Sequence, residues 1–312
     1  MTVADRPPRP APPWSVRDGL ATLDEPATEL LRTLDDTFAA WGTAAGAVRM
    51  TFPPLLRAAD LRTLDYFRNF PHLGSLVARL RPDRLTAYGD GASPASGGST
   101  DVTPAPANGT TGTVPAHDLT AAAHLLPSAA CYACFLHFSG MRTDAPLLVT
   151  TAAQCFRNED RHDGLRRMWG FTMREIVCVG PADRVRDHLD RSHARIAAFA
   201  ARLGLPLSRQ PATDPFFQKD GARSVMQVLA PVKDEYVHTD GTAVASVNHH
   251  RNFFGERCDI RYAGRPAFTG CVAFGLERWL HVLAERFAGD LDAARAAVRE
   301  AGAAVRDAGE RP

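Results

Sequence analysis

The spacing of apolar residues predicts several amphipathic helices. Over residues 27–41 apolar side chains recur every three or four positions, with acids and arginines between them, as on one face of a helix. The same spacing predicts a helix over 182–203, where Val185, Leu189 and Ile196 share one face and arginines lie opposite. Further helices are expected over 58–67, 73–80, 274–287 and 291–308.

Short apolar segments bounded by glycine, proline and polar residues predict strands. The first covers 47–52 and ends at Pro53 and Pro54, because proline restricts the residue before it and cannot donate to a ladder. A succession of strands with helices before and after them indicates the α+β class, with a mainly antiparallel β-sheet flanked by helices. The later strands are expected over 130–138, 147–156, 171–179, 225–229, 234–238, 244–248 and 258–262.

Two segments lack the apolar residues that a packed element needs. Residues 1–15 are rich in proline and predict a disordered tail. Residues 89–117 consist almost wholly of small and polar residues, which predicts a flexible insertion. Because apolar segments resume directly after it, we interpret the insertion as a loop within a single domain over 16–312. A boundary between two domains is the alternative.

Composition narrows the function classes. The chain has 312 residues, with 36 Lys and Arg against 35 Asp and Glu and a formal net charge of +1. Such a balance argues against a protein that holds nucleic acid mainly through bulk electrostatics. No apolar run is long enough to span a membrane, no signal-peptide pattern is present, and the cysteines do not form a disulfide framework. A cytoplasmic protein without a membrane role is therefore expected.

The segment 155–180 concentrates polar chemistry. A strand would place Arg157 and Glu159 on one face, and a returning strand would place Phe171 and Glu175 beside them, below a loop that carries further arginines. A guanidinium beside an aromatic ring suits a nucleotide, with stacking for the base and charge-assisted hydrogen bonds for phosphates. The alternative is a surface hairpin whose charges are solvated.

Cysteine spacing alone indicates a different site. Cys131 and Cys134 form a CxxC pair, which is compatible with a local zinc or redox pair. Spacing does not connect either cysteine with a residue far along the chain.

Three motifs in order resemble those of the class II aminoacyl-tRNA synthetases. Residues 156–159 (FRNE), 164–167 (GLRR) and Phe171 with Glu175 resemble motif 2. Residues 271–278 (CVAFGLER) resemble motif 3, in which an arginine stacks on adenine. The helix over 27–41 and the strand over 47–52 resemble motif 1, through which this class forms dimers.

Within that class the chain resembles the amino acid:[carrier protein] ligases, relatives of the archaeal-type seryl-tRNA synthetases. This resemblance extends over nearly the whole chain apart from the tail, the insertion and the last helix. The segments that carry it are Thr51–Leu55, Asp65–His72, Leu126–Tyr132, Phe171–Val177 and Gly270–Arg278.

The resemblance implies a class II synthetase core and a zinc ion held by Cys131, Glu175 and Cys271. Three protein ligands leave one zinc position for the α-amino group of the substrate. The other four cysteines, Cys134, Cys155, Cys178 and Cys258, are then expected to be packing residues.

The resemblance also implies an ATP site. Arg157 would bridge the substrate carboxylate and the α-phosphate, Phe171 and Arg278 would enclose adenine, and Glu159 would accept from the adenine amino group or hold the loop. The outer phosphates and their magnesium ion would be bound by Arg166, Arg167 and Glu235. Ser246, Asn248 and His250 could line the amino-acid pocket, or they could be polar residues at a strand end satisfied by the backbone.

The implied reaction is ATP-dependent activation of a small amino acid, glycine or alanine, and its transfer to the phosphopantetheine thiol of a carrier protein. A homodimer through residues 27–55 is expected, and tRNA is not, because no long heptad arm precedes the motif 1 helix. Residues 241–248 lack an acid that seryl-tRNA synthetases carry. An arginine face of the 182–203 helix (Arg184, Arg186, Arg191 and Arg195) is a candidate docking surface for an acidic carrier, or simply a solvated face. The alternatives are a truncated seryl-type tRNA synthetase and a catalytically silent paralogue that binds or regulates.

Overall fold

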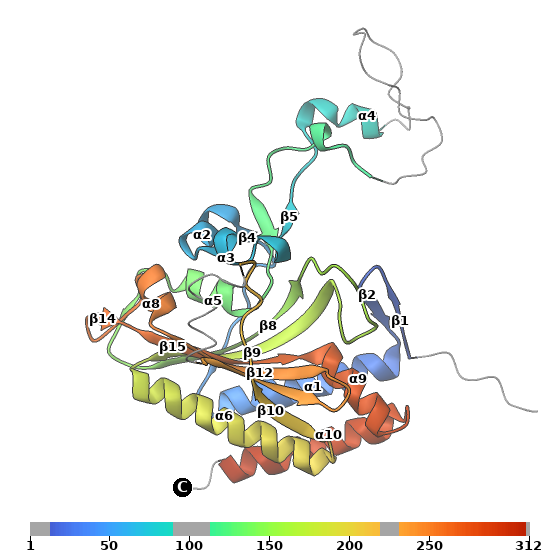
Figure 1. Cartoon of the computed structure of the whole chain (residues 1–312), viewed down its shortest axis with the longest axis vertical. Coiled ribbons are helices and arrows are strands. Elements are labelled where there is room, and N and C mark those ends of the chain that lie inside the picture. The colour runs from blue at the N-terminus through green and yellow to red at the C-terminus, as the bar shows by residue number, and fades with distance from the viewer. Residues whose placement is uncertain (1–12, 90–112, 219–230, 310–312) are drawn as a thin grey trace, which may run out of the picture.

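A seven-stranded sheet forms the centre of the molecule (Figure 1). The computed structural model describes residues 13–89, 113–218 and 231–309. Neighbouring strands are antiparallel except β3 and β8, which are parallel, so the sheet confirms the predicted α+β class. The strand order is β10 (Leu207–Pro211), β11 (Lys233–His238), β12 (Ala243–Arg251), β15 (Phe268–Gly275), β9 (Gly170–Gly180), β8 (Leu147–Phe156) and β3 (Val48–Arg49).

Long helices cover one face of this sheet (Figure 1). An aromatic core joins them to it, with the rings of Phe38 and Phe274 stacked at a centroid distance of 4.0 Å and Trp279 buried beside them. Burial of such rings is a main source of stability, at roughly 25 cal/mol per Å² of apolar area. The helices are α1 (Glu25–Ala44), α6 (Ala182–Leu203), α9 (Leu276–Arg286) and α10 (Leu291–Gly309).

Local sequence explains where these helices begin and end. The Asp24 carboxylate accepts a hydrogen bond from the Ala27 amide at 3.0 Å, and Pro26 lies in the first turn of α1. Helix α6 follows Pro181 and stops at Gly204, whose φ of +64° suits glycine. The predicted helix over 182–203 is confirmed at both ends.

Short elements cover the other face of the sheet (Figure 1). Here the rings of Phe135 and Phe254 stack at 3.9 Å in a second apolar cluster. The short helices are α2 (Ala58–Thr63), α3 (Tyr66–Asn69), α4 (Thr86–Gly89), α5 (Cys131–His137) and α8 (Phe253–Arg257), with 3₁₀ turns at Pro71–Leu73, Pro82–Arg84 and Ala116–Asp118. The short strands are β1 (Trp14–Arg17), β2 (Leu20–Leu23), β4 (Leu56–Arg57), β5 (Ser75–Val77), β6 (His124–Leu126), β7 (Arg142–Thr143), β13 (Arg261–Tyr262) and β14 (Arg265–Pro266).

Several predicted elements were wrong. The strand expected over 130–138 is helix α5, because a short apolar run has no decisive period and its first amides are bound by a distant carboxylate. The helix expected over 73–80 contains strand β5 instead. Most of the strand expected over 258–262 is a turn between α8 and β13. The strand expected over 225–229 lies outside the described residues.

Some residues that were assigned to the predicted tail and insertion belong to ordered elements in the structure. Strand β1 begins at Trp14, whose ring packs against the main core, so the last residues of the predicted tail are ordered. The last two residues of the predicted insertion begin the 3₁₀ turn Ala116–Asp118, and the buried Asp118 carboxylate directly after the insertion accepts hydrogen bonds from Arg84 and Tyr88. Residues 1–12 and 90–112 lie outside the described residues. Among the described helices, none is long and apolar enough to cross a membrane.

An ion pair joins the helical layer to the central strand β9. Arg174 is buried and donates from Nε and Nη2 to the two carboxylate oxygens of Asp35 on α1, each at 2.7 Å. Removal of Asp35 would leave this guanidinium buried without its counter-charge.

We expect Asp35→Ala to lower the free energy of unfolding by about 3 kcal/mol. The matched control is Asp36→Ala, because Asp36 is exposed on the same helix and its loss should cost under about 0.5 kcal/mol. Urea unfolding measures both values. Equal effects of the two substitutions would show that the Arg174–Asp35 pair does not anchor α1.

Candidate active site

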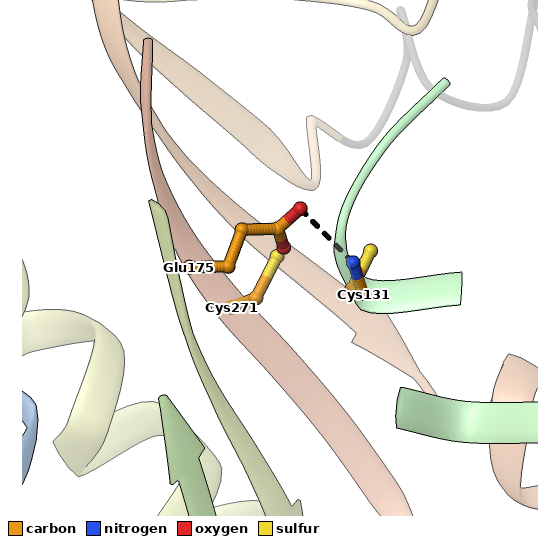
Figure 2. Close-up of side chains that lie close together, drawn as sticks. All are labelled: Cys131, Glu175 and Cys271. Carbon is orange, nitrogen blue, oxygen red and sulfur yellow. Dashed lines mark hydrogen bonds between the residues drawn. The ribbon is translucent and has the colours of Figure 1, made fainter. Parts of the chain in front are cut away.

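Two cysteines and a glutamate converge on the cavity side of the sheet (Figure 2). Glu175 lies on β9 and Cys271 on the neighbouring β15, and both side chains point toward Cys131 at the start of α5. One ligand atom from each residue lies within 4.8 Å of the other two. All three residues are buried, so three separate segments build one compact donor cluster.

The hydrogen bonds of Glu175 show what this cluster can hold. Its Oε1 accepts from the amides of Ala130 at 2.9 Å and Cys131 at 3.1 Å, whereas its Oε2 is buried and has no hydrogen-bond partner among the described residues. Two thiols and an unsatisfied carboxylate oxygen are a donor set that zinc accepts, with room for a fourth ligand. These residues therefore fit a zinc ion.

Burial disfavours the charged forms of these three side chains when no cation is bound. Burial raises the pKa of Glu175. The hydrogen bond with Cys271 lowers the pKa of Cys131, but burial and the neighbouring carboxylate outweigh it and raise that pKa to about 12. A divalent cation would reverse this balance, because it stabilises the thiolates and the carboxylate and releases their protons.

The remaining cysteines lie in the packed interior. Cys134 is fully buried in the cluster of Phe135 and Phe254, and burial raises its pKa to about 13. It is not part of the donor cluster, so the CxxC pair does not form a local site with the ligands described. Cys155, Cys178 and Cys258 are buried as well, and no disulfide joins any of the cysteines.

A narrow pocket of about 60 Å³ lies beside the cluster and brings together most of the residues assigned to ATP. The Arg157 guanidinium carbon lies 5.2 Å from the centroid of the Phe171 ring. Arg278 lines the same pocket, and burial lowers its pKa to about 10, which still leaves it charged at neutral pH. Glu159 and Glu235 complete the assigned residues of this pocket.

Neutral oxygens hold the two arginines of this pocket. Arg157 Nε donates to the Ser128 carbonyl at 3.1 Å, and Arg278 donates to the carbonyls of Arg166 and Ala243 at 2.9 and 3.0 Å. Neither guanidinium forms an ion pair with an acid in the described part of the chain. Both positive charges therefore remain available to an anion.

Arg166 and Arg167 do not line this pocket. Arg167 forms an ion pair with Glu159 at 2.8 Å, and Arg166 donates to Thr242 and to the Asp240 carbonyl. The Glu235 carboxylate lies 3.0 Å from Lys233 Nζ. Glu235, the acid offered for magnesium, thus already has a cationic partner.

A larger cavity of about 460 Å³ adjoins the first and contains the donor cluster. Ser246, Asn248 and His250, the candidate residues of the amino-acid pocket, line it. Asn248 Nδ2 donates to Cys271 Sγ at 3.5 Å, and His250 Nε2 lies 3.7 Å from the same sulfur. Arg157 and Lys233 line both cavities and so lie at their junction.

Sequence reasoning missed Lys233 and Glu277. Lys233 is one of only two lysines in the chain, and that rarity was an available signal. Glu277 precedes Arg278 in the motif 3 segment, and its carboxylate accepts from the Thr172 amide and hydroxyl at 2.8–2.9 Å. This buried contact joins the segment of Arg278 to the strand that carries Phe171.

Several known proteins are similar to this chain in sequence and fold. Residues 120–287 match the model of the tRNA synthetase class II core domain (G, H, P, S and T). The protein named "Amino acid--[acyl-carrier-protein] ligase 1" from Bradyrhizobium diazoefficiens is 32% identical over 276 residues, which are 82% of this chain and 76% of that protein. The type-2 serine–tRNA ligase of Methanocaldococcus jannaschii is 30% identical over 131 residues, which are 38% of this chain and 25% of that protein.

A solved structure shows the same fold. The M. kandleri SerRS, in its complex with A. aeolicus tRNASec, superposes with a TM-score of 0.70 at 16% identity, over 86% of this chain and 54% of that chain. Together with the converging motif residues, these similarities confirm the predicted class II synthetase core. The chain therefore belongs to the class II tRNA synthetase core family and, within it, to the amino acid--[acyl-carrier-protein] ligases.

Proposed function

We propose that the protein activates a small amino acid with ATP and transfers it to the phosphopantetheine thiol of a carrier protein. The observation that carries this proposal is the junction of the two cavities. Arg157 and Lys233 line two adjoining cavities. One contains two arginines that have no acidic partner in the described part of the chain, and the other contains a donor cluster that would bind an amine. The names of relatives that cover most of the chain support the same reaction.

The first step needs no general base, since a carboxylate is already ionised at neutral pH. A carboxylate oxygen attacks the α-phosphorus of ATP, the bond between the α- and β-phosphates breaks, and pyrophosphate leaves. Arg157 would contact both the carboxylate and the α-phosphate, while Phe171 and Arg278 enclose adenine. Catalysis then consists of positioning and of stabilising charge on phosphate oxygens.

The donor cluster would select the amino group. Zinc bound there by Cys131, Glu175 and Cys271 would supply an open coordination position for a neutral amine. Asn248 and His250, both near the Cys271 sulfur, would line the pocket of the amino acid, for which we propose glycine or alanine. Ser246 lines both cavities and would lie between the amine and the activated carboxyl group.

Arg166, Arg167 and Glu235, the other residues assigned to ATP and magnesium, already have partners within the protein. Arg167 must leave Glu159, and Arg166 must leave Thr242, before either can contact the outer phosphates. Glu235 would bind magnesium in competition with Lys233. We infer that these residues rearrange when ATP binds.

In the second step a phosphopantetheine thiolate attacks the carbonyl carbon of the adenylate. A thioester forms, the bond to the phosphate oxygen breaks, and AMP leaves. The arginine face of α6 is a poor docking surface for the carrier, because α6 covers the opposite face of the sheet from the cavity (Figure 1), and Arg195 there donates to the Trp41 carbonyl.

A second candidate function is transfer to tRNA, favoured by the similarity to type-2 serine–tRNA ligases over 131 residues. A catalytically silent paralogue is disfavoured, because Arg157, Phe171, Arg278 and the three cluster residues are all present and assembled. Transfer assays distinguish these functions.

We expect ATP–pyrophosphate exchange that depends on glycine or alanine among the twenty amino acids, followed by transfer to a phosphopantetheinylated carrier protein. Exchange is measured with labelled pyrophosphate, and transfer by the mass of the carrier. The same carrier without phosphopantetheine is the control. Absence of exchange with every amino acid in zinc-loaded protein would reject the enzyme, and transfer to tRNA alone would favour the second candidate.

We expect Glu175→Gln and Cys271→Ser to remove bound zinc and to reduce exchange by at least about 100-fold, because both lose a zinc ligand. Elemental analysis and exchange assays check this. Cys134→Ser is the matched control, since Cys134 is buried on the same helix as Cys131 but lies outside the cluster. Activity in metal-free Cys271→Ser protein would contradict the zinc assignment.

We further infer a homodimer through residues 27–55. Strand β3 ends the sheet, and Val48 on it and Leu55 after it are 56% and 37% exposed, so an unpaired edge and apolar side chains are available to a second copy. Sedimentation should show a dimer that Val48→Glu dissociates. Leu76→Glu, at an apolar residue 61% exposed outside this segment, should leave it intact. A monomeric wild-type chain would contradict the inference.

A further inference from the structure

A second group of metal-binding side chains lies between the β11–β12 hairpin and helix α9. His238 is the last residue of β11, and Asp240 lies in the turn that follows. His281 and Glu285 are four residues apart on α9 and therefore on one face of it. None of these residues lines the two cavities of the candidate active site.

Several pairs of donor atoms in this group are spaced as neighbouring ligands of one ion are. His281 Nε2 lies 3.0 Å from Asp240 Oδ2 and 3.5 Å from Glu285 Oε1, and His238 Nδ1 lies 3.1 Å from Asp240 Oδ1. One atom each from His238, Asp240 and Glu285 lie within 4.8 Å of one another. Two bonds of about 2.0–2.1 Å at roughly 90–110° would separate neighbouring ligand atoms by about 2.9–3.4 Å.

An independent observation comes from His238. Its Nδ1 is buried and forms no hydrogen bond within the described part of the chain, although Asp240 Oδ1 is close to it. A buried ring nitrogen without a hydrogen bond normally costs free energy, so it requires an explanation. A cation between the two elements would supply its partner.

The surroundings also prepare Asp240 as a ligand. The Thr242 amide donates to Oδ1 at 2.8 Å, and the Thr242 hydroxyl donates to Oδ2 at 2.9 Å, which fixes the orientation of the carboxylate as outer-shell contacts do. Arg166 Nε is 3.4 Å from Oδ2, but the hydrogen bonds of this guanidinium go to the Thr242 hydroxyl and the Asp240 carbonyl. Glu285 is 53% exposed and leaves the group open to solvent.

We propose that His238, Asp240, His281 and Glu285 form a second divalent-cation site, separate from the cysteine cluster. Two imidazoles and two carboxylates suit zinc and the neighbouring ions cobalt, nickel and manganese better than calcium or magnesium. The ion would fasten the β11–β12 hairpin to α9. By fixing Asp240, the ion would also fix Arg166, which donates to the Asp240 carbonyl and whose own carbonyl accepts from Arg278. The ion would act in this way without lining either cavity.

Cobalt titration of the metal-free, full-length protein tests this proposal. Cobalt at a site without cysteine gives no thiolate-to-cobalt charge-transfer band, so the two sites are distinguishable in one spectrum. We expect wild-type protein and Cys271→Ser to bind one cobalt ion that lacks this band. His281→Ala should lose this ion. Glu285→Ala should lower the cobalt affinity by more than roughly 10- to 100-fold, which is the loss that removal of an outer-shell partner causes.

The matched control is His193→Ala. His193 Nε2 lies 3.6 Å from Asp234 and its Nδ1 bonds to Tyr236, so it forms a histidine–aspartate pair without a second imidazole, and its loss should leave cobalt binding unchanged. Because Glu285 is half exposed, its variant should fold even if His281→Ala does not. Cobalt binding in Glu285→Ala and His281→Ala that equals wild type, or no binding beyond the cysteine cluster in wild type, would overturn the proposal.

Discussion

The candidate active site depends on the interactions of the Glu175 carboxylate. One of its oxygens binds the amides of Ala130 and Cys131 at the start of helix α5, and the other is buried near two thiols and has no hydrogen-bond partner among the described residues. A buried carboxylate is costly unless its charge is matched, and two amides satisfy only one oxygen. The same side chain thus fixes a helix that is far away in sequence and creates the demand for a cation. If Glu175 were replaced by an apolar residue, α5 would lose its anchor and the cluster its only carboxylate.

Much of the fold could be predicted from the sequence where the pattern was long or the motif specific. Helix α6 has six turns of regular apolar spacing, and its bounds agree with the prediction. The order of Arg157, Phe171 and Arg278 along the chain matches the motifs of a known family, which allowed the prediction that they lie close together, and all three line one pocket. Helix α5 could not be predicted, because its apolar run is too short to show a period and its conformation is set by Glu175. The pairing of Arg166 with the Asp240 turn was also beyond the sequence, since it joins residues far apart in the chain.

The distribution of counter-charges separates two kinds of arginine near the site. Arg157 and Arg278 are held by carbonyl oxygens, which orient a guanidinium and leave its charge uncompensated. Arg166 and Arg167 are held by or beside carboxylates. An incoming nucleotide would therefore meet two guanidinium groups without acidic partners in the described part of the chain, whereas the other two must exchange partners. The buried contact between Glu277 and Thr172 keeps the former pair on a common frame, because it joins helix α9 to strand β9.

The neighbouring charges of β9 have a consequence for folding. Arg174 faces the helices and binds Asp35, whereas Glu175 faces the cavity and binds α5. Successive residues of a strand point to opposite faces, so a slip of one position in strand pairing would exchange them. The guanidinium would then enter the donor cluster, and the carboxylate would be buried among the aromatic rings of the helical layer. A sheet mispaired in this way would carry two buried charges without partners. Arg174 and Glu175 therefore favour the correct register of β9 over registers shifted by one residue.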